Sequence, residues 1–349
     1  MIIFFIGLLG GLLTTNQPVA AGNSSNRTAG VSNVVVTPNP NDPVEKEFQK
    51  LMEDDDAALA EVDGWIRENQ AFASQGAGVP NADLNRRIRA RLDTVRKAYE
   101  DFLKRHPDHA RAHTAFGSFL GNSLFDEEGQ EAEYDKARQL DPQDPAPWNN
   151  LANLYGHRGP VKKAFEYYAK AIELDPNESV YYFNFAVTVY LFRKDAREYY
   201  QITEQQVFDK ALELYRKAIK LDPTNFELAT EFAESYYGIQ PTRTEDALRA
   251  WTNALAIAQD EIQREGVYIH LARIKLHAER FDEARQHLSA VTNGMYNDLK
   301  ERLLRNLNAQ ESKAKGTNSP AGTNSPVETI ISMKTNSPPA TNSPPREKE

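Results

Sequence analysis

The chain has 349 residues, a formal net charge of −9 and no cysteine. The absence of cysteine excludes disulfide bonds, thiolate metal sites, a cysteine nucleophile and a lipid anchor attached to cysteine. Nucleic-acid binding needs a basic surface that displaces counterions from phosphates, so the excess of Asp and Glu argues against a nucleic-acid partner.

Residues 1–21 have the pattern of a signal peptide. Residues 2–13 are apolar apart from glycines, and this run is shorter than the ~20 residues that a membrane-spanning helix needs. Val19 and Ala21 suit cleavage before Gly22. We therefore predict export to a periplasm or the medium, with no stable membrane span after cleavage. Because no Lys or Arg precedes the apolar run, membrane anchoring by residues 2–13 and a cytoplasmic location stay open as alternatives.

The next two segments lead into the repeats. Residues 22–42 are rich in Asn, Ser and Pro, a composition typical of a disordered linker. Residues 43–109 predict a helical pair, with a first helix over residues 44–70. Val95, Tyr99 and Phe102 then keep the spacing of a second helix. This pair is either an N-terminal cap or a degenerate repeat.

A repeat with a period near 34 residues follows. The tripeptide Leu-Asp-Pro occurs three times and ends at Pro142, Pro176 and Pro223. The first two prolines are 34 residues apart, and the third lies 47 residues further on, which is 34 plus 13. A fixed period of this length predicts a stack of helical pairs.

The clearest unit spans residues 145–178. Its apolar residues lie at i, i+3, i+4 and i+7 in each half, which places them on one face of a helix. Gly159 and Pro160 separate the two halves, because neither residue favours a helix interior. The residues at the repeating positions are Trp148, Leu151, Ala152, Tyr155, Ala164, Tyr168, Ala171 and Pro176.

These eight positions resemble the signature of the tetratricopeptide repeat family, and the register extends over residues 80–293. The resemblance implies an all-α, right-handed solenoid of about five helical pairs. The solenoid would occupy residues 110–310, with a capping helix over residues 297–310. The family usually has glycine where Ala152 stands.

An insertion of 13 residues interrupts the third unit. Thr203 and Gln206 have the spacing of a capping box, so the next helix should start near Glu204. Residues 192–206 are therefore expected to form a long loop at one rim of the stack. Loops that interrupt a regular repeat often carry contacts.

Two tyrosines of this loop, Tyr199 and Tyr200, are candidate partner-binding residues. A tyrosine on a rim presents both an apolar ring and a polar hydroxyl to a partner. The alternative is that both side chains fold back onto Phe192 and Phe208 and serve the core.

The family resemblance implies that the first helix of each pair lines a concave groove. Its exposed positions here are Asn149, Asn150 and Asn153 in the second unit, and Asn184 and Tyr190 in the third. Asparagine offers a donor and an acceptor, which suits a peptide backbone of any sequence. Asn150 and Asn184 share one repeat position, so we expect them to stand one above the other.

Glu227, Glu231 and Glu234 occupy the groove-facing side of the fourth unit. Family members that clamp a C-terminal carboxylate carry Lys, Lys and Arg at the positions of Asn149, Glu227 and Glu231. The acidic trio would repel a carboxylate, and it predicts a basic partner instead.

The histidines are the remaining candidates for chemistry. His109 and His113 could share a helix face at i, i+4, as zinc ligands do, but no Glu follows His109 in the metalloprotease pattern. We predict packed histidines, no metal, no cofactor and no catalytic residues. Histidine chemistry near these residues and His106, or near His270 and His277, is the enzyme alternative.

The tail over residues 311–349 contains four copies of Thr-Asn-Ser-Pro, at Thr317, Thr323, Thr335 and Thr341. Such a polar repeat cannot bury a core and predicts disorder. It can be a spacer, a set of Ser-Pro phosphorylation sites, or a neutral low-complexity segment.

Taken with the groove, these features predict a non-catalytic scaffold that binds an extended peptide segment of a protein partner. A structural or accessory subunit of an envelope complex is the alternative. Such a subunit would dock through the convex face or through the 192–206 loop.

Expression of the chain with its native start in a bacterium tests the signal peptide. We expect the purified protein to begin at or near Gly22, as read by N-terminal sequencing, because Val19 and Ala21 fit the cleavage site. Recovery of intact Met1 from the cytoplasm would refute the export prediction.

Overall fold

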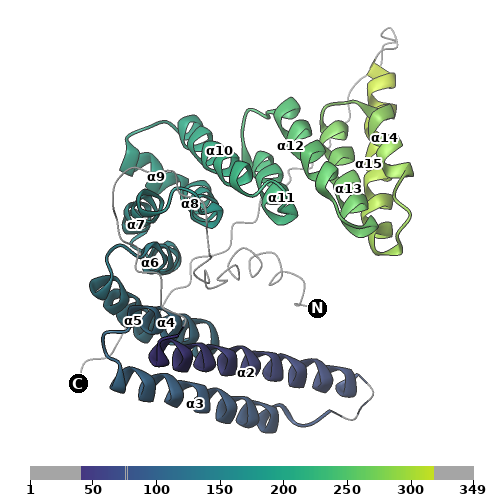
Figure 1. The fold of residues 1–349 in the computed structure, drawn as a ribbon. Helices are drawn as coiled ribbons and strands as arrows, with labels where there is room; N and C mark the ends of the chain where they lie inside the picture. The colour runs from purple at the N-terminus through teal and green to yellow at the C-terminus, as the bar shows by residue number, and fades with distance from the viewer. Residues whose placement is uncertain (1–40, 75, 77, 318–349) are drawn as a thin grey trace, which may run out of the picture.

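The computed structural model describes residues 41–74, 76 and 78–317, and in that part of the chain every regular element is a helix. The predicted all-α stack of helical pairs is confirmed (Figure 1). The predicted signal peptide, most of the linker and most of the tail lie outside the described residues.

The stack begins with a long hairpin of α2 (Pro43–Ala73) and α3 (Asn81–Arg105), followed by α4 (Ala110–Leu124) and α5 (Glu127–Leu140). The helices that follow are α6 (Pro145–Arg158), α7 (Val161–Leu174), α8 (Ser179–Leu191), α9 (Arg193–Tyr200), α10 (Glu204–Leu221), α11 (Phe226–Ser235), α12 (Thr244–Ile257), α13 (Glu261–His277), α14 (Phe281–Ser289) and α15 (Asn297–Thr317), with the short 3-10 turns η1 (Tyr236–Gly238) and η2 (Gly294–Tyr296).

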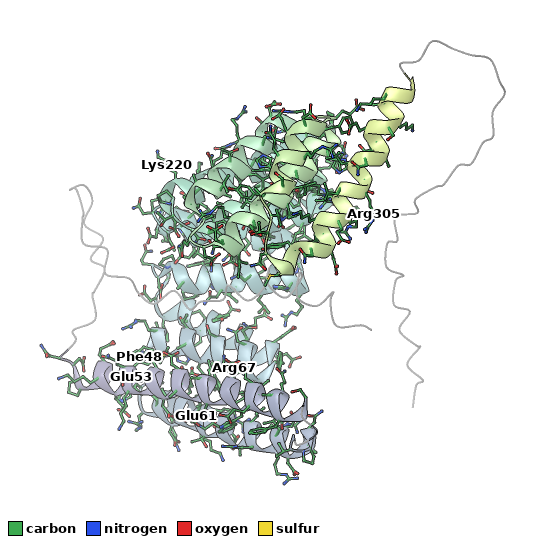
Figure 2. All side chains as sticks on the ribbon, turned by 90° about the vertical axis from the view of Figure 1, so that its right-hand side faces the viewer. Phe48, Glu53, Glu61, Arg67, Lys220 and Arg305 are labelled. Carbon is green, nitrogen blue, oxygen red and sulfur yellow. The ribbon has the colours of Figure 1, made fainter. Side chains whose placement is uncertain are left out.

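The stack is curved, with α6, α8 and α11 on its inner side and α7, α10 and α12 on its outer side (Figure 1). The hairpin and α15 lie at opposite ends. Figure 2 shows Phe48, Glu53, Glu61 and Arg67 along α2, and Arg305 on α15 at the other end. No helix within the described residues has both the length and the apolar character needed to cross a bilayer.

Side-chain caps begin several of the helices. Asp144 accepts a hydrogen bond from the backbone of Ala146 at 2.9 Å and begins α6. Thr203 and Gln206 form the predicted capping box, and α10 starts at Glu204 as expected. Each cap satisfies backbone N–H groups that have no partner inside the helix.

The core runs through the stack as a chain of neighbouring contacts. One cluster joins residues from α5 to α13, a second joins α2, α3 and α4, and a third joins α13, α14 and α15. The bulky members from the second helices are at most 2% exposed: Tyr99, Tyr134, Tyr168, Tyr215 and Trp251. Each unit therefore depends on its neighbours to bury its apolar face.

Two predicted boundaries differ from the structure. The insertion is not a long loop, because residues 193–200 form α9. Ala196, Tyr199 and Tyr200 lie at i, i+3 and i+4 on its buried face. The tail does not begin at Glu311, because α15 continues to Thr317.

Ala152 tests the packing of the helical pairs. It is fully buried in the cluster that joins α6, α7 and α8, so Ala152→Leu should overpack the core and lower the free energy of unfolding by about 1–3 kcal/mol. Ala169→Leu on the exposed side of α7 is the matched control. Chemical unfolding monitored by circular dichroism measures both, and equal effects of the two substitutions would contradict the packing.

Candidate functional site

The concave face contains a chain of asparagine contacts between α6 and α8. Asn149 donates from Nδ2 to Oδ1 of Asn150 at 3.3 Å and accepts at Oδ1 from Nδ2 of Asn184 at 3.2 Å. Asn149 is only 3% exposed, while Asn150 and Asn184 are half-buried. The prediction that Asn149 is exposed is therefore wrong, because its side chain joins two neighbouring units. Asn184 bonds to Asn149 rather than to Asn150, its equivalent in the repeat.

Asn153 serves the core as well as the groove. Its Oδ1 accepts a hydrogen bond from the hydroxyl of Tyr168 at 2.6 Å. The same hydroxyl accepts a hydrogen bond from Oγ1 of Thr188 in α8 at 3.2 Å. Burial raises the pKa of Tyr168, so the hydroxyl stays protonated and needs an acceptor. Asn153 provides that acceptor and links α6 to α7.

Earlier pairs repeat this contact with other residue types. Tyr134 of α5 and Ser118 of α4 are joined through their hydroxyl groups at 2.9 Å. In the N-terminal hairpin, the hydroxyl of Tyr99 donates to Oδ2 of Asp55 at 2.7 Å. Burial raises the pKa of Asp55 to about 6, against the opposing effect of the Tyr99 hydrogen bond. The hairpin thus contains the same kind of internal contact, between a buried tyrosine hydroxyl and the first helix, as the repeats that follow it.

Tyr190, at the end of α8, joins the third unit to the fourth. Its ring lies 5.9 Å from the ring of Phe208, and Arg193 lies over it at 5.3 Å. Its hydroxyl occupies the space that a Cβ atom on Gly238 would fill. Gly238 therefore allows the two units to approach closely, and burial raises the pKa of Tyr190.

An acidic surface follows on α11. Glu227, Glu231 and Glu234 lie at i, i+4 and i+7, and so share one side of the helix. Burial, together with the charges of Glu234 and Glu227, raises the pKa of Glu231 to about 7. Among the described residues, no ion pair involves Glu227 or Glu231, so the negative charge of this surface is not compensated locally.

Glu234, the last of these three residues, faces His270 of α13. Its carboxylate is 3.9 Å from Nε2 of His270, but burial lowers the pKa of His270 to about 4, so the imidazole is neutral at pH 7. His270 stacks on Trp251 with ring centroids 4.0 Å apart, and its Nδ1 is 2.9 Å from the hydroxyl of Tyr237. Burial raises the pKa of Glu234, and the positive charge of Arg273 opposes part of this rise. Arg273 lies over the ring of Tyr237 at 4.5 Å.

Tyr199 and Tyr200 do not form an open contact surface. Both are half-buried and pack on Phe165 of α7, with ring centroids 5.5 and 5.7 Å away. Lys210 of α10 lies over the ring of Tyr200 at 4.3 Å. The two tyrosines fold back onto the core, as one alternative predicted, but their aromatic partner is Phe165 rather than Phe192 or Phe208.

The N-terminal histidines have separate structural contacts. Nδ1 of His109 accepts from the backbone of Ala112 at 3.0 Å and caps α4. His113 lies between Oε2 of Glu133, at 2.5 Å from Nδ1, and the carbonyl oxygen of Pro107, at 2.9 Å from Nε2. The residues that the structure describes contain no group of three or more His, Cys, Asp or Glu side chains arranged to hold a metal ion.

The contacts of Thr188 with Tyr168 and of Tyr237 with His270 were not predicted from the sequence. A signal was present for Thr188, because a buried tyrosine in the second helix needs hydrogen-bond partners from its neighbours. The contact between Tyr237 and His270 spans two units, and no local periodicity indicates it.

Comparisons with known proteins agree with this architecture. The family model described as "Tetratricopeptide repeat" matches residues 146–178 and 205–225. No curated protein matches the sequence.

Solved structures that match part of this chain include three at low sequence identity. YrrB, described as a TPR protein with an unusual peptide-binding site, is 16% identical, with a TM-score of 0.44 over 62% of this chain and 99% of that one. MamA is 18% identical, with a TM-score of 0.39 over 50% and 92% of the two chains. PilF of Pseudomonas aeruginosa is 16% identical, with a TM-score of 0.45 over 74% and 99%.

Asn153 provides a test of the link between groove and core. Asn153→Ala should lower the free energy of unfolding by about 1–3 kcal/mol, because the hydroxyl of Tyr168 loses its acceptor. Asn150→Ala, which changes the same residue type on the same helix, should have a smaller effect. In the double variant with Tyr168→Phe, the cost of Asn153→Ala should shrink, since the hydroxyl is gone. Additive costs in this double-mutant cycle would rule out the coupling.

Proposed function

We propose that this chain, which contains tetratricopeptide repeats, is a non-catalytic scaffold that binds an extended, basic segment of a partner protein along its concave face. The observation that carries the proposal is Glu231, a half-buried carboxyl group that has no ion-pair partner among the described residues. A lysine or arginine side chain of a partner would supply the missing positive charge.

Binding of a cation at this surface has a physical basis. Glu231 is partly removed from water, where the attraction between opposite charges is stronger than in bulk solvent. A bound cation favours the ionised carboxylate, so its arrival lowers the pKa of Glu231 from about 7. Binding should therefore release a proton near neutral pH and become tighter as pH rises through 7.

The amide groups on the inner helices α6 and α8 support an extended ligand. Asn150 and Asn184 are half-buried on neighbouring inner helices, and each side chain offers both a donor and an acceptor. Such groups fit the N–H and C=O groups of a peptide backbone irrespective of sequence. In this proposal, the amides hold the backbone and the acidic trio selects basic side chains.

The histidine contacts favour a scaffold over an enzyme. His109 and His113 are held by backbone and carboxylate groups in the N-terminal units. His270 has a pKa near 4 because of burial and Arg273, which makes it a weak general base near pH 7. The same proposal includes export, which the pattern of residues 1–21 supports.

The alternative, an accessory subunit that docks through its outer face, is favoured by one feature. The inserted helix α9 packs on α7 and α10, and its outward side carries the exposed residues Lys194, Arg197 and Glu198. Charge reversal at Lys194 and Arg197 should abolish partner binding in this case, while changes at Glu231 should have no effect.

Glu231→Gln tests the proposed function. The probes are two acetylated decapeptides, one of alternating lysine and alanine and one of alternating glutamate and alanine, titrated by calorimetry. The wild type should bind the lysine peptide more tightly, and Glu231→Gln should weaken that binding about fivefold, since close charge pairs contribute at this scale. The preference should fade as salt rises. Glu213→Gln on α10 removes the same charge from an exposed outer site and should have little effect.

The same variant has a predicted pH dependence of stability. The pKa of Glu231 is raised by folding, so the folded protein holds this proton more tightly than the unfolded chain does. Stability should therefore fall as pH rises from about 4.5 to about 7, and Glu231→Gln should reduce this fall. Equal binding of the two peptides, with no effect of Glu231→Gln on either measurement, would refute the acidic groove.

A further inference from the structure

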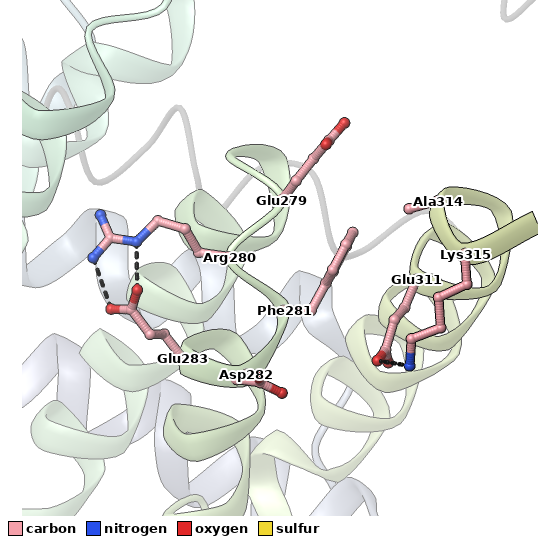
Figure 3. A pocket seen from close by; sticks show the side chains of 8 residues that line it. All are labelled: Glu279, Arg280, Phe281, Asp282, Glu283, Glu311, Ala314 and Lys315. Atoms are coloured by element: carbon pink, nitrogen blue, oxygen red, sulfur yellow. Dashed lines mark hydrogen bonds and ion pairs between the residues drawn. The ribbon is translucent and has the colours of Figure 1, made fainter. Parts of the chain in front are cut away.

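A crevice lies at the C-terminal end of the stack, away from the concave asparagines and glutamates. It opens between the start of α14 and the last turns of α15, and its volume is about 440 Å³. Phe281 of α14 and Ala314 of α15 line it, and the half-buried ring of Phe281 points across the opening toward α15 (Figure 3). This volume is within the ~300–1,000 Å³ range of ordinary binding pockets.

The charges around the crevice divide into paired and unpaired groups. Arg280 binds Glu283 through two hydrogen bonds of 2.6 and 2.7 Å, and Lys315 binds Glu311 at 2.6 Å (Figure 3). Glu279 and Asp282 also line the crevice, but neither forms an ion pair within the described part of the chain. The crevice thus has apolar lining residues and uncompensated acidic groups at its edge.

The chain itself continues from the edge of this crevice. α15 ends at Thr317, two residues beyond the lining residue Lys315. The four Thr-Asn-Ser-Pro copies that follow begin at residues 317, 323, 335 and 341, so their spacings are 6, 12 and 6. The wide spacing contains residues 327–334, Val-Glu-Thr-Ile-Ile-Ser-Met-Lys, which interrupt the polar repeat with large apolar side chains and end in a cation.

We propose that residues 327–334 of the same chain dock into this crevice. Ile330 and Ile331 would cover Phe281 and Ala314, because burial of aliphatic groups against a half-exposed aromatic ring is favourable. Lys334 would lie beside Glu279 and Asp282 and supply their missing counter-charge. This intramolecular site is independent of the proposed groove function, and it would cover the open end of the stack.

The tether makes such docking effective even if the contact is weak. Ile330 lies 13 residues after Thr317, and a flexible chain of this length spans roughly 20 Å on average and about 43 Å when extended. A short flexible linker gives an effective local concentration in the millimolar range. A contact with millimolar affinity would therefore be substantially occupied.

Disulfide trapping in the full chain tests the proposal, since the protein has no cysteine of its own. Two double variants share Ala314→Cys: one adds Ser332→Cys in the apolar segment, and the other adds Ser325→Cys in a Thr-Asn-Ser-Pro copy. If the segment is only tethered, the disulfide in the Ser332→Cys variant should form about twofold more slowly than the one in the Ser325→Cys variant, because its loop has 18 residues rather than 11. If the segment docks, the disulfide in the Ser332→Cys variant should form about fivefold faster than the one in the Ser325→Cys variant.

Changes on each side of the contact identify what holds the segment. Phe281→Ala should remove the fivefold faster disulfide formation of the Ser332→Cys variant. The double variant Glu279→Lys/Asp282→Lys should remove it as well, because the new lysines would repel Lys334. The Lys double variant alters only the edge of the crevice, so it keeps the test valid if Phe281→Ala perturbs the fold, which circular dichroism monitors. If, without these further changes, the disulfide of the Ser332→Cys variant forms about twofold more slowly than that of the Ser325→Cys variant, as tethering alone predicts, the proposal is overturned. Cross-linked dimers that increase with protein concentration would also overturn it and indicate a second copy as occupant.

Discussion

A bulky side chain at one repeated position of the second helices holds the stack together. Tyr99, Tyr134, Tyr168, Tyr215 and Trp251 occupy this position in successive pairs, and each is at most 2% exposed. Removal of such a side chain from a core costs roughly 3–5 kcal/mol, because a cavity remains. Two short helices cannot bury their faces alone, so this contact determines how closely each unit approaches the next and, through the curvature of the stack, where the inner face lies.

The polar end of this side chain also limits what the inner face can contain. The hydroxyl groups of Tyr99, Tyr134 and Tyr168 bond to Asp55, Ser118 and Asn153 on the first helices. Ser118 and Asn153 occupy one position of the repeat, and in the fourth unit that position is Glu234, opposite Trp251. Nε1 of Trp251 has no hydrogen-bond partner. In the third unit the same position is Val187, which cannot bond to the hydroxyl of Tyr215, so the tyrosine contact ends one unit before the acidic surface begins.

The sequence predicted those features that depend on local pattern. The prolines and the 3.6-residue periodicity gave the helical pairs, and Thr203 and Gln206 gave the start of α10, because these signals act within one helix. The contacts of Asn149 and Asn153 could not be predicted, since a polar residue on an inner helix has the same pattern whether it faces solvent or a neighbouring unit. α9 was missed because eight residues show too little periodicity, although Ala196, Tyr199 and Tyr200 do share one face.

The two halves of the inner face differ in charge: the side chains on α6 and α8 are uncharged amides, whereas those on α11 are carboxyl groups. Between α6 and α8, amide groups bond to one another and to Tyr168, so they are held in fixed positions and carry no charge. On α11, burial and the charges of Glu234 and Glu227 together raise the pKa of Glu231, which has no counter-ion among the described residues. Amides accept any backbone, whereas crowded carboxyl groups discriminate by charge. A ligand that spans both halves would therefore be held by its backbone at one end and selected by its side chains at the other.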